Sequence, residues 1–262
     1  MPHLTRDGVK LCYDDAGRGE PAMVFVHGWC CDRSHFSEQI AHFSPAHRCV
    51  SLDLRGHGES DAPADACSIP AFADDVAFVC DELGLRNPII VGHSMGGAIA
   101  LSLAARYPDL PSAIVMLDGA ILQPDALTAL VEEVNPVLHS DGYLEPLTQI
   151  FHGMFMATDD AARHERIVAS AIATPRHVVV AEWDALWAND SAADAAACKV
   201  PALYVGAHAP AGDMMRIREA MPHAIIAQTA GAGHFHQLEV PEQVNAMIER
   251  FLVVSGLGAG GS

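Results

Sequence analysis

Val91-Gly92-His93-Ser94-Met95-Gly96-Gly97-Ala98 is the most specific pattern in this chain of 262 residues. It has the form G-x-S-x-G, with the apolar run Pro88–Val91 before it and the alanine- and leucine-rich segment Ser94–Arg106 after it. This context predicts a strand that turns directly into a helix and presents Ser94 at the carboxyl end of the strand. Such a turn needs small neighbours, which Gly92 and Gly96 supply, and strains the backbone of the central residue. Ser94 is therefore our candidate nucleophile.

A serine hydroxyl is a poor nucleophile without a base. The segment Ala230-Gly231-Ala232-Gly233-His234-Phe235-His236 follows the last predicted strand and precedes the last predicted helix. Its loop should therefore lie at the same sheet edge as Ser94, and we predict that His234 is the base. His236 is the competing candidate, for which pocket lining or local capping is the favoured role. A His-x-His metal site is conceivable, but no carboxylate or cysteine cluster accompanies the pair, so we expect neither a metal nor another cofactor.

Acyl transfer also needs donors for the developing oxyanion. An earlier apolar run ends in Phe25-Val26-His27-Gly28-Trp29, where glycine allows close backbone approach. We predict that the backbone N–H groups of Trp29 and Met95 form the oxyanion hole. His27 is expected to orient this loop rather than to react.

Apolar runs alternate with helical patterns along most of the chain, which predicts an α/β fold with a mostly parallel sheet and helices on both faces. The predicted strands are Lys10–Tyr13, Ala22–Val26, Cys49–Leu52, Pro88–Val91, Ala113–Leu117, Ala202–Val205 and Ala224–Ala227. The helices predicted between and after them are His35–Phe43, Ile69–Leu83, Ser94–Arg106, Asp213–Met221 and Val240–Val253. The strands from the third onward are continuously apolar, as in strands buried on both faces.

The interval from Gly119 to Lys199 is far longer than a crossover requires. Its pattern is helical, over Pro124–Leu138, Tyr143–Met156, Asp160–Ile172 and His177–Trp187. We predict a helical cap over residues 119–199, an α/β core over 1–118 and 200–255, and a flexible tail over 256–262. The apolar and aromatic residues of the interval are expected either to line a substrate pocket above Ser94 or to serve only as packing; they are Phe151, Met154, Phe155, Trp183 and Trp187.

The net charge and the cysteine content of the chain indicate which partners and which location to expect. The formal net charge of −18 repels phosphate backbones and anionic lipids, so neither nucleic acid nor a membrane surface is expected as a partner. A small molecule, neutral or cationic, is the expected substrate, and the protein is expected to be a monomer or a homodimer. The seven cysteines show no C-x-x-C spacing, and no apolar run approaches a membrane span. Free thiols in a reducing, cytoplasmic location are therefore expected.

Taken together, these segments resemble the α/β-hydrolase superfamily over nearly the whole chain. The resemblance rests on His27-Gly28-Trp29, Asp53-Leu54-Arg55-Gly56-His57-Gly58-Glu59-Ser60, the Ser94 turn, and Gly233-His234-Phe235. It implies a mostly parallel eight-stranded sheet with a cap inserted after the sixth strand. Serine at position 94 argues against the dehalogenases and epoxide hydrolases of this superfamily, which use aspartate there. We expect hydrolysis of a carboxylic ester or lactone.

Other functions remain open at this point. The run Gly28-Trp29-Cys30-Cys31-Asp32 resembles a loop of the cofactor-free dioxygenases that open N-heteroaromatic rings, in which the serine is not acylated. Met95 and Gly96-Gly97 are instead ordinary hydrolase residues. A C–C bond hydrolase and a slow-turnover ligand receptor on the same scaffold are further alternatives, because fold alone does not determine chemistry.

The acid that supports His234 departs from the commonest family pattern. Most relatives place it shortly after the seventh strand, where this chain has Ala209. Asp213 lies further along the same loop, whereas Asp118 ends the sixth strand and is followed by glycine. A minority of the superfamily places the acid after the sixth strand. We predict Asp118 as the acid, with Asp213 as the alternative, and a local cap is the competing interpretation for either.

Overall fold

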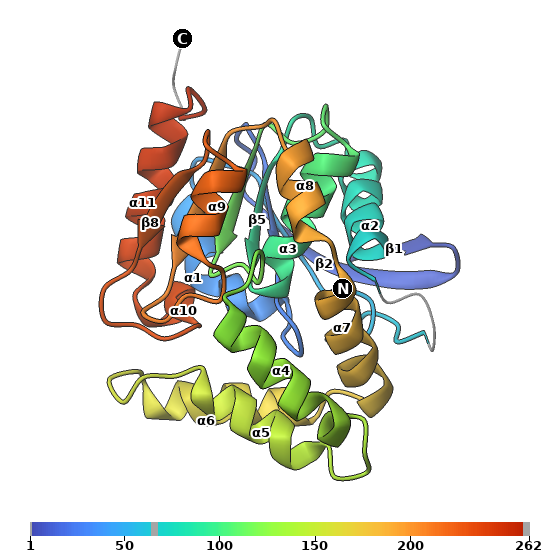
Figure 1. Ribbon diagram of the computed structural model, residues 1–262. Coiled ribbons are helices and arrows are strands. Elements are labelled where there is room, and N and C mark those ends of the chain that lie inside the picture. Colours follow the sequence, from blue (N-terminus) through green and yellow to red (C-terminus); the bar gives the residue numbers. More distant parts are fainter. Residues whose placement is uncertain (1, 64–67, 259–262) are drawn as a thin grey trace.

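The computed structural model describes residues 2–63 and 68–258. Its centre is one eight-stranded sheet, which Figure 1 shows with helices around it. The strand order is β1-β2-β4-β3-β5-β6-β7-β8; β1–β2 and β2–β4 are antiparallel pairs and all the other pairs are parallel. The strands are β1 (His3–Arg6), β2 (Val9–Ala16), β3 (Met23–Val26), β4 (Cys49–Leu52), β5 (Ile89–His93), β6 (Ala113–Leu117), β7 (Ala202–Gly206) and β8 (Ile225–Gln228). The predicted fold class is confirmed.

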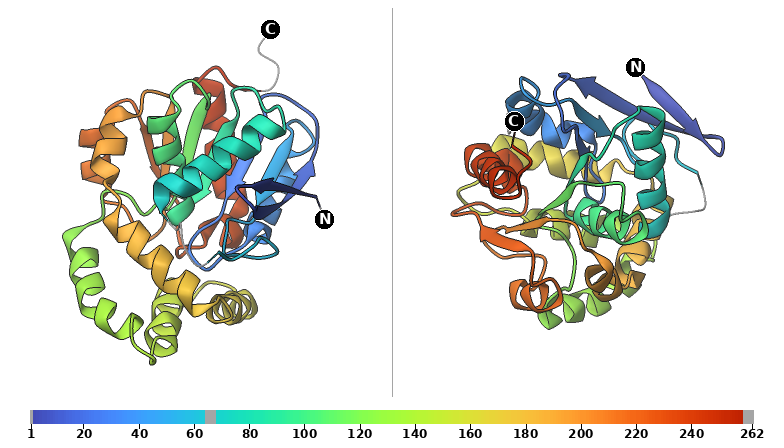
Figure 2. Two further views of the ribbon diagram at one scale, coloured as in Figure 1. Left: turned by 90° about the vertical axis from the view of Figure 1, so that its right-hand side faces the viewer. Right: turned by 90° about the horizontal axis from the view of Figure 1, so that it is seen from above.

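Helices cover both faces of this sheet (Figure 2). One face packs against α1 (Ser37–Phe43) and α11 (Pro241–Val254), and the other against α2 (Ile69–Glu82), α3 (Met95–Arg106), α8 (Ser191–Ala197) and α9 (Met214–Ala220). A short 3-10 helix η1 (Arg33–Phe36) leads into α1, and α10 (His236–Glu239) leads into α11.

Successive residues of the central strands supply the two cores in alternation. In β3, Met23 and Phe25 belong to the α1/α11 core, while Val24 and Val26 belong to the core under α2 and α3. All four are fully buried. Strands buried on both faces have no polar side, which is why their sequences are continuously apolar.

Two strand predictions need correction. β1 was not predicted, because its four residues pair only with β2 and half of them are exposed. β8 was expected to be buried on both faces, and this is wrong. It pairs only with β7, and its terminal residues Ile225 and Gln228 are exposed, because an edge strand has a neighbour on one side only.

The long interval between β6 and β7 is helical, as predicted. It contains α4 (Asp125–Leu138), α5 (Leu144–Gly153), α6 (Ala161–Ile172) and α7 (Arg176–Ala188), which lie together at the carboxyl ends of the parallel strands, away from the body of the sheet (Figures 1 and 2). We call α4–α7 the inserted helices. α8 also falls in the interval, but it packs against α3 on a face of the sheet. The division into a core and a separate cap domain stays a prediction.

The remaining expectations concern the chain end and the cysteines. After α11, the Leu257 amide donates to the Leu252 carbonyl, and residues 259–262 of the predicted flexible tail lie outside the described residues. Six cysteines are free and buried, while Cys67 lies outside the described residues. Within residues 2–63 and 68–258, no helix is both long enough and apolar enough to span a membrane. The cytoplasmic location stays a prediction.

Candidate active site

Ser94 lies on a strained turn between β5 and α3. Its φ of 55° and ψ of −117° lie in a region that side chains rarely occupy. A Cβ at Gly92 would overlap the Gly96 carbonyl oxygen, and one at Gly96 would overlap the Val26 carbonyl oxygen. The turn is held from the next strand as well, because the Ser94 amide donates to the Leu117 carbonyl at 3.0 Å. This geometry explains the two glycines of the motif.

Asp118 and His234 are in direct contact, although 116 positions separate them in sequence. The Nδ1 of His234 lies 2.6 Å from Oδ2 of Asp118. The Oδ1 atom of Asp118 accepts hydrogen bonds from the backbone amides of Ala207 and Ala211, each at 3.1 Å. Asp118 is fully buried, so its charge is satisfied by these three donors instead of by water.

This contact assigns the proton on the His234 ring. Burial by itself would raise the pKa of Asp118, but the hydrogen bond and charge interaction with His234 outweigh burial and lower that pKa. Asp118 is therefore an acceptor, and Nδ1 of His234 carries the hydrogen. In the neutral ring the lone pair is then on Nε2, the atom that a general base uses.

The two competing candidates have other partners. Asp213 begins α9, where its carboxylate accepts from the amides of Met215 and Arg216 at 2.9 and 3.1 Å. It is thus a helix N-cap, one of the two interpretations open from sequence. His236 is buried, and its Nδ1 lies 3.0 Å from the Thr229 hydroxyl. Burial lowers the pKa of His236 to about 4, so it is neutral at physiological pH.

His93 joins the Ser94 turn to the His234 loop. Its ring centroid lies 4.6 Å from that of His234, and its Nε2 lies 2.9 Å from the His234 carbonyl oxygen, to which it donates. No hydrogen bond links the Ser94 hydroxyl directly to His234 in the described part of the chain. Such hydrogen bonds are often long in unliganded enzymes and tighten when substrate binds. The structure brings the two residues to adjoining turns.

The predicted oxyanion loop packs against the serine. A Cβ at Gly28 would lie 3.0 Å from the Cβ of Ser94, so glycine permits the close approach. Neither the Trp29 amide nor the Met95 amide donates a hydrogen bond to another described residue. His27 orients the loop as expected: its Nδ1 lies 2.8 Å from the Gly28 carbonyl oxygen, and its Nε2 accepts from the Leu54 amide at 3.0 Å.

The aromatic residues of the inserted helices, together with Phe155 between α5 and α6, make ring contacts beside this loop. Trp29 lies 5.7 Å from Phe151 and 5.1 Å from Trp183, measured between ring centroids. Trp187 contacts Trp183 at 5.4 Å and so lies one ring further from Trp29. Phe155 stacks at 5.1 Å on Phe235, the neighbour of His234. Phe151 and Trp183 are buried, and substrate contact by any of these residues stays a prediction.

Sequence reasoning missed how the segment between α5 and α6 holds the His234 loop. The His234 amide donates to the Met154 carbonyl at 2.7 Å, and the Gly233 amide donates to the Asp159 carboxylate at 3.2 Å. Met154 was predicted for its side chain, whereas its backbone makes the contact. No sequence signal identifies a backbone acceptor, and Asp159 stands in an ordinary polar turn between α5 and α6.

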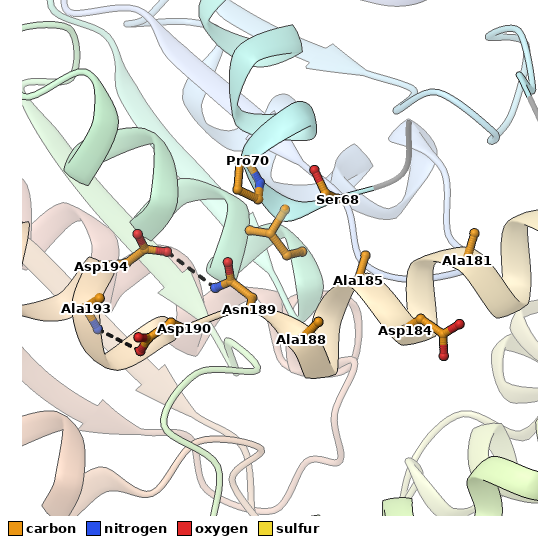
Figure 3. Close-up of a pocket in the computed structure, with 11 residues that line it drawn as sticks. Ser68, Pro70, Ala181, Asp184, Ala185, Ala188, Asn189, Asp190, Ala193 and Asp194 are labelled. Carbon is orange, nitrogen blue, oxygen red and sulfur yellow. Dashed lines mark hydrogen bonds between the residues drawn. The ribbon is translucent and has the colours of Figure 1, made fainter. Parts of the chain in front are cut away.

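A surface pocket of about 580 Å³ lies elsewhere, between the start of α2 and the helices α7 and α8 (Figure 3). Its lining includes Ile69, Ala181, Ala185 and the carboxylates of Asp184, Asp190 and Asp194. None of the predicted site residues lines it.

Comparison with known proteins agrees with this architecture. Residues 21–166 match the family model described as the alpha/beta hydrolase fold. The chain therefore belongs to the α/β hydrolase family.

Individual relatives include several hydrolases. A bifunctional esterase/perhydrolase of Acinetobacter calcoaceticus is 39% identical over 119 residues, which are 45% of this chain and 43% of that protein. The chain spans less than half the length of such curated relatives. Among solved structures, Est816, an N-acyl homoserine lactone degrading enzyme, has a TM-score of 0.82 and 26% identity, over 95% of this chain and 100% of that one. The enol-lactonase from Burkholderia xenovorans LB400 shares the fold, with a TM-score of 0.85 at 23% identity, over 96% and 100%.

The glycines of the turn provide a structural prediction. Gly92→Ala should lower the free energy of unfolding by about 1–3 kcal/mol or more, because the added methyl group must displace the Gly96 backbone. Gly153→Ala is the matched control, since nothing lies within 4 Å of its added Cβ. Urea denaturation measures both variants. Equal stability of the two would contradict the packing described for this turn.

Proposed function

We propose that this protein is a serine hydrolase that cleaves a carboxylic ester or lactone of a small, largely apolar molecule. Ser94 is the nucleophile, His234 the general base and Asp118 the acid that orients it. The observation that carries the proposal is the 2.6 Å contact between Asp118 and His234 beside a serine on a strained strand–helix turn. A buried carboxylate on Nδ1 fixes the imidazole tautomer that a serine nucleophile needs.

In the first half of the reaction, Ser94 Oγ attacks the substrate carbonyl carbon while His234 Nε2 takes the hydroxyl proton. The carbonyl oxygen becomes an oxyanion, which the Trp29 and Met95 amides stabilise. Both amides are free of other acceptors in the described residues, and Met95 begins α3, whose dipole favours negative charge there. The intermediate collapses to an acyl-enzyme as His234 gives its proton to the leaving alcohol oxygen.

In the second half, His234 takes a proton from water, and the resulting hydroxide attacks the acyl carbon. The proton returns to Ser94 Oγ as the acid product leaves. Asp118 stays ionised throughout and stabilises the imidazolium that forms twice in the cycle. Its lowered pKa supports this role.

The substrate class rests on the inserted helices and on the relatives. We propose that α4–α7 form a cap and that their aromatic side chains select an apolar or aromatic group. The names of the esterase/perhydrolase and of the lactone-degrading enzyme among the relatives support ester or lactone cleavage. A net charge of −18 favours a neutral or cationic molecule over an anionic one.

A ring-cleaving dioxygenase without cofactor is the second candidate. The Gly28–Asp32 loop and the position of the acid after β6 favour this function, because both resemble such dioxygenases. In that reaction His234 and Asp118 would deprotonate the substrate directly. The two functions differ in their need for oxygen. Turnover of p-nitrophenyl esters or lactones without oxygen supports the hydrolase, whereas oxygen-dependent loss of a heteroaromatic substrate supports the dioxygenase.

Replacement of the nucleophile tests the proposal first. Ser94→Ala should reduce kcat for an ester by about 10⁶-fold and leave the fold intact, because a triad nucleophile has no substitute. Steady-state kinetics and circular dichroism measure the two effects. A serine-directed phosphonate should also label Ser94, and labelling of a different residue would refute the assignment.

The two aspartates form a second test. Asp118→Asn should lower kcat by about 10⁴-fold, because the amide no longer fixes the tautomer of His234. Asp213→Asn is the matched control: asparagine also caps helices, so both activity and stability should be retained. The opposite ranking of the two variants would move the acid to the loop after β7.

The cap proposal is tested with esters of graded size. Trp183→Ala and Trp187→Ala should each change the ratio of kcat/KM between large and small esters, because the removed ring helps to shape the apolar site. Leu144→Ala, on an exposed position of α5, is the control. An equal loss for all esters, accompanied by a lower Tm, would mean that these rings serve only as packing.

A further inference from the structure

A buried acid–base pair joins the inserted helix α7 to the core. The Nε2 of His57 lies 3.1 Å from Oε2 of Glu182, and the two side chains are 1% and 0% exposed. This contact is a close approach of the two atoms rather than a hydrogen bond of regular geometry, and neither carboxylate oxygen of Glu182 has a hydrogen-bond partner among the described residues. The reaction proposed above uses neither residue. A buried charge costs considerable free energy unless it is paired, so the pair calls for a role of its own.

The pair lies on the face of α7 that covers the oxyanion loop. On the same face, the Val179 carbonyl accepts a hydrogen bond from the Trp29 indole at 3.0 Å, and the Trp183 ring lies 5.1 Å from the Trp29 ring. Val178 packs closely on Gly56: a Cβ added at Gly56 would lie only 2.7 Å from the Cγ1 atom of Val178. The position of Trp29 therefore depends on how α7 is docked.

The hydrogen-bonding pattern indicates that this pair holds one proton between its facing atoms. The Nδ1 of His57 lies 3.2 Å from the Arg55 carbonyl oxygen, an acceptor, so Nδ1 carries a hydrogen. The facing atoms, Nε2 and Oε2, are both acceptors when unprotonated. One proton between them gives attraction, either as imidazolium and carboxylate or as imidazole and carboxylic acid. With no proton, a buried carboxylate faces a lone pair.

Neighbouring groups cannot replace that proton. The His27 ring lies 4.8 Å from the His57 ring. The Leu54 amide donates to the Nε2 atom of His27, so that atom carries no hydrogen and His27 is neutral. Burial, and secondarily the Glu182 charge, raises the pKa of the Cys30 thiol well above its ordinary value, so it stays protonated. Cys31, Asp32, His35 and Asp53 also act electrostatically on this cluster. The carboxylate of Asp53 is paired with Arg33.

We propose that His57 and Glu182 are positioning residues that form a one-proton latch, which holds α7 on the oxyanion loop and thereby fixes the Trp29 amide. The effect on Trp29 rests on the proposed hydrolase function, whereas the latch itself does not.

The direction of the pH dependence follows from the pair. Burial alone would lower the pKa of His57, but the Glu182 carboxylate raises it, and burial raises the pKa of Glu182. Both groups thus hold the proton more tightly in the docked structure than in water. The stabilisation is fully present when the pH is below the ordinary pKa values of the two groups. It is lost as the pH rises through the raised pKa values that they have in the docked structure. The latch should therefore weaken on the alkaline side.

The chain contains its own probe for this interface. Its three tryptophans are Trp29, Trp183 and Trp187, which form one continuous set of ring contacts. Tryptophan fluorescence therefore reports on the docking of α7 against the oxyanion loop. Undocking should admit water and shift the emission to longer wavelength.

The experiment is a titration of tryptophan emission and acrylamide quenching from about pH 6 to about pH 10. The wild-type emission should shift to the red as the pH rises, and quenching should increase. In Glu182→Gln the shift should be lost, because the amide N–H donates to the His57 Nε2 atom at every pH in this range. Asp184→Asn is the matched control: Asp184 also lies on α7 and pairs with a histidine, His139 at 3.1 Å, but both are exposed. It should titrate like the wild type.

Kinetics separate positioning from packing. For an ester, kcat of the wild type should fall over the same alkaline range and KM should change less, while kcat of Glu182→Gln should stay on its plateau. A wild-type emission that does not change with pH, or a Glu182→Gln emission that titrates like the wild type, would overturn the latch. Failure of the phosphonate to label Ser94, with the fluorescence result intact, would instead overturn only the hydrolase function.

Discussion

The hydrogen bond between Asp118 and His234 is the interaction on which the rest of the candidate site depends. It links the end of β6 to the loop after β8, and its carboxylate is fully buried. That charge is tolerable because the loop after β7 supplies two backbone amides to the other oxygen. The register of the sheet positions the acid, since the Asp118 amide donates to the Val205 carbonyl and the Ser94 amide to the Leu117 carbonyl. Ser94 and Asp118 are thus held at the ends of β5, β6 and β7, and His234 is held there through its contact with Asp118.

The inserted helices complete this arrangement from the opposite side. The Met154 carbonyl accepts from the His234 amide, and Phe155 stacks on Phe235, so the His234 loop is held both by the sheet and by the connection between α5 and α6. The face of α7 that includes Glu182 contacts the oxyanion loop in the same way. Under the proposed function, any motion that admits substrate under α4–α7 also changes the environment of the base and of the oxyanion donors. Binding and chemistry would then be coupled through contacts that are largely backbone and aromatic.

Much of this could be predicted from the sequence, for identifiable physical reasons. Continuous apolar runs predicted the central strands, and G-x-S-x-G predicted the strained turn, because both patterns reflect local steric and burial requirements. Asp118 was preferred over Asp213 because an acid at a strand end is positioned by the sheet. The rest depends on tertiary context. β1 has no continuous apolar run, because its residues alternate between exposed and half-buried positions, and the exposure of β8 follows from its place at the edge. The Met154 carbonyl and the His57–Glu182 pair join segments that are distant in sequence, where no local pattern indicates a partner.

The central claim is that Ser94 becomes acylated with the help of the Asp118–His234 pair. The most direct measurement is mass spectrometry of the enzyme quenched during turnover of a p-nitrophenyl ester, followed by peptide mapping. The account predicts a mass increase equal to the acyl group on the peptide that contains Ser94. It further predicts that Asp118→Asn accumulates this adduct far more slowly than the wild type. Substrate turnover without any covalent adduct, or an adduct on a residue other than Ser94, would contradict it.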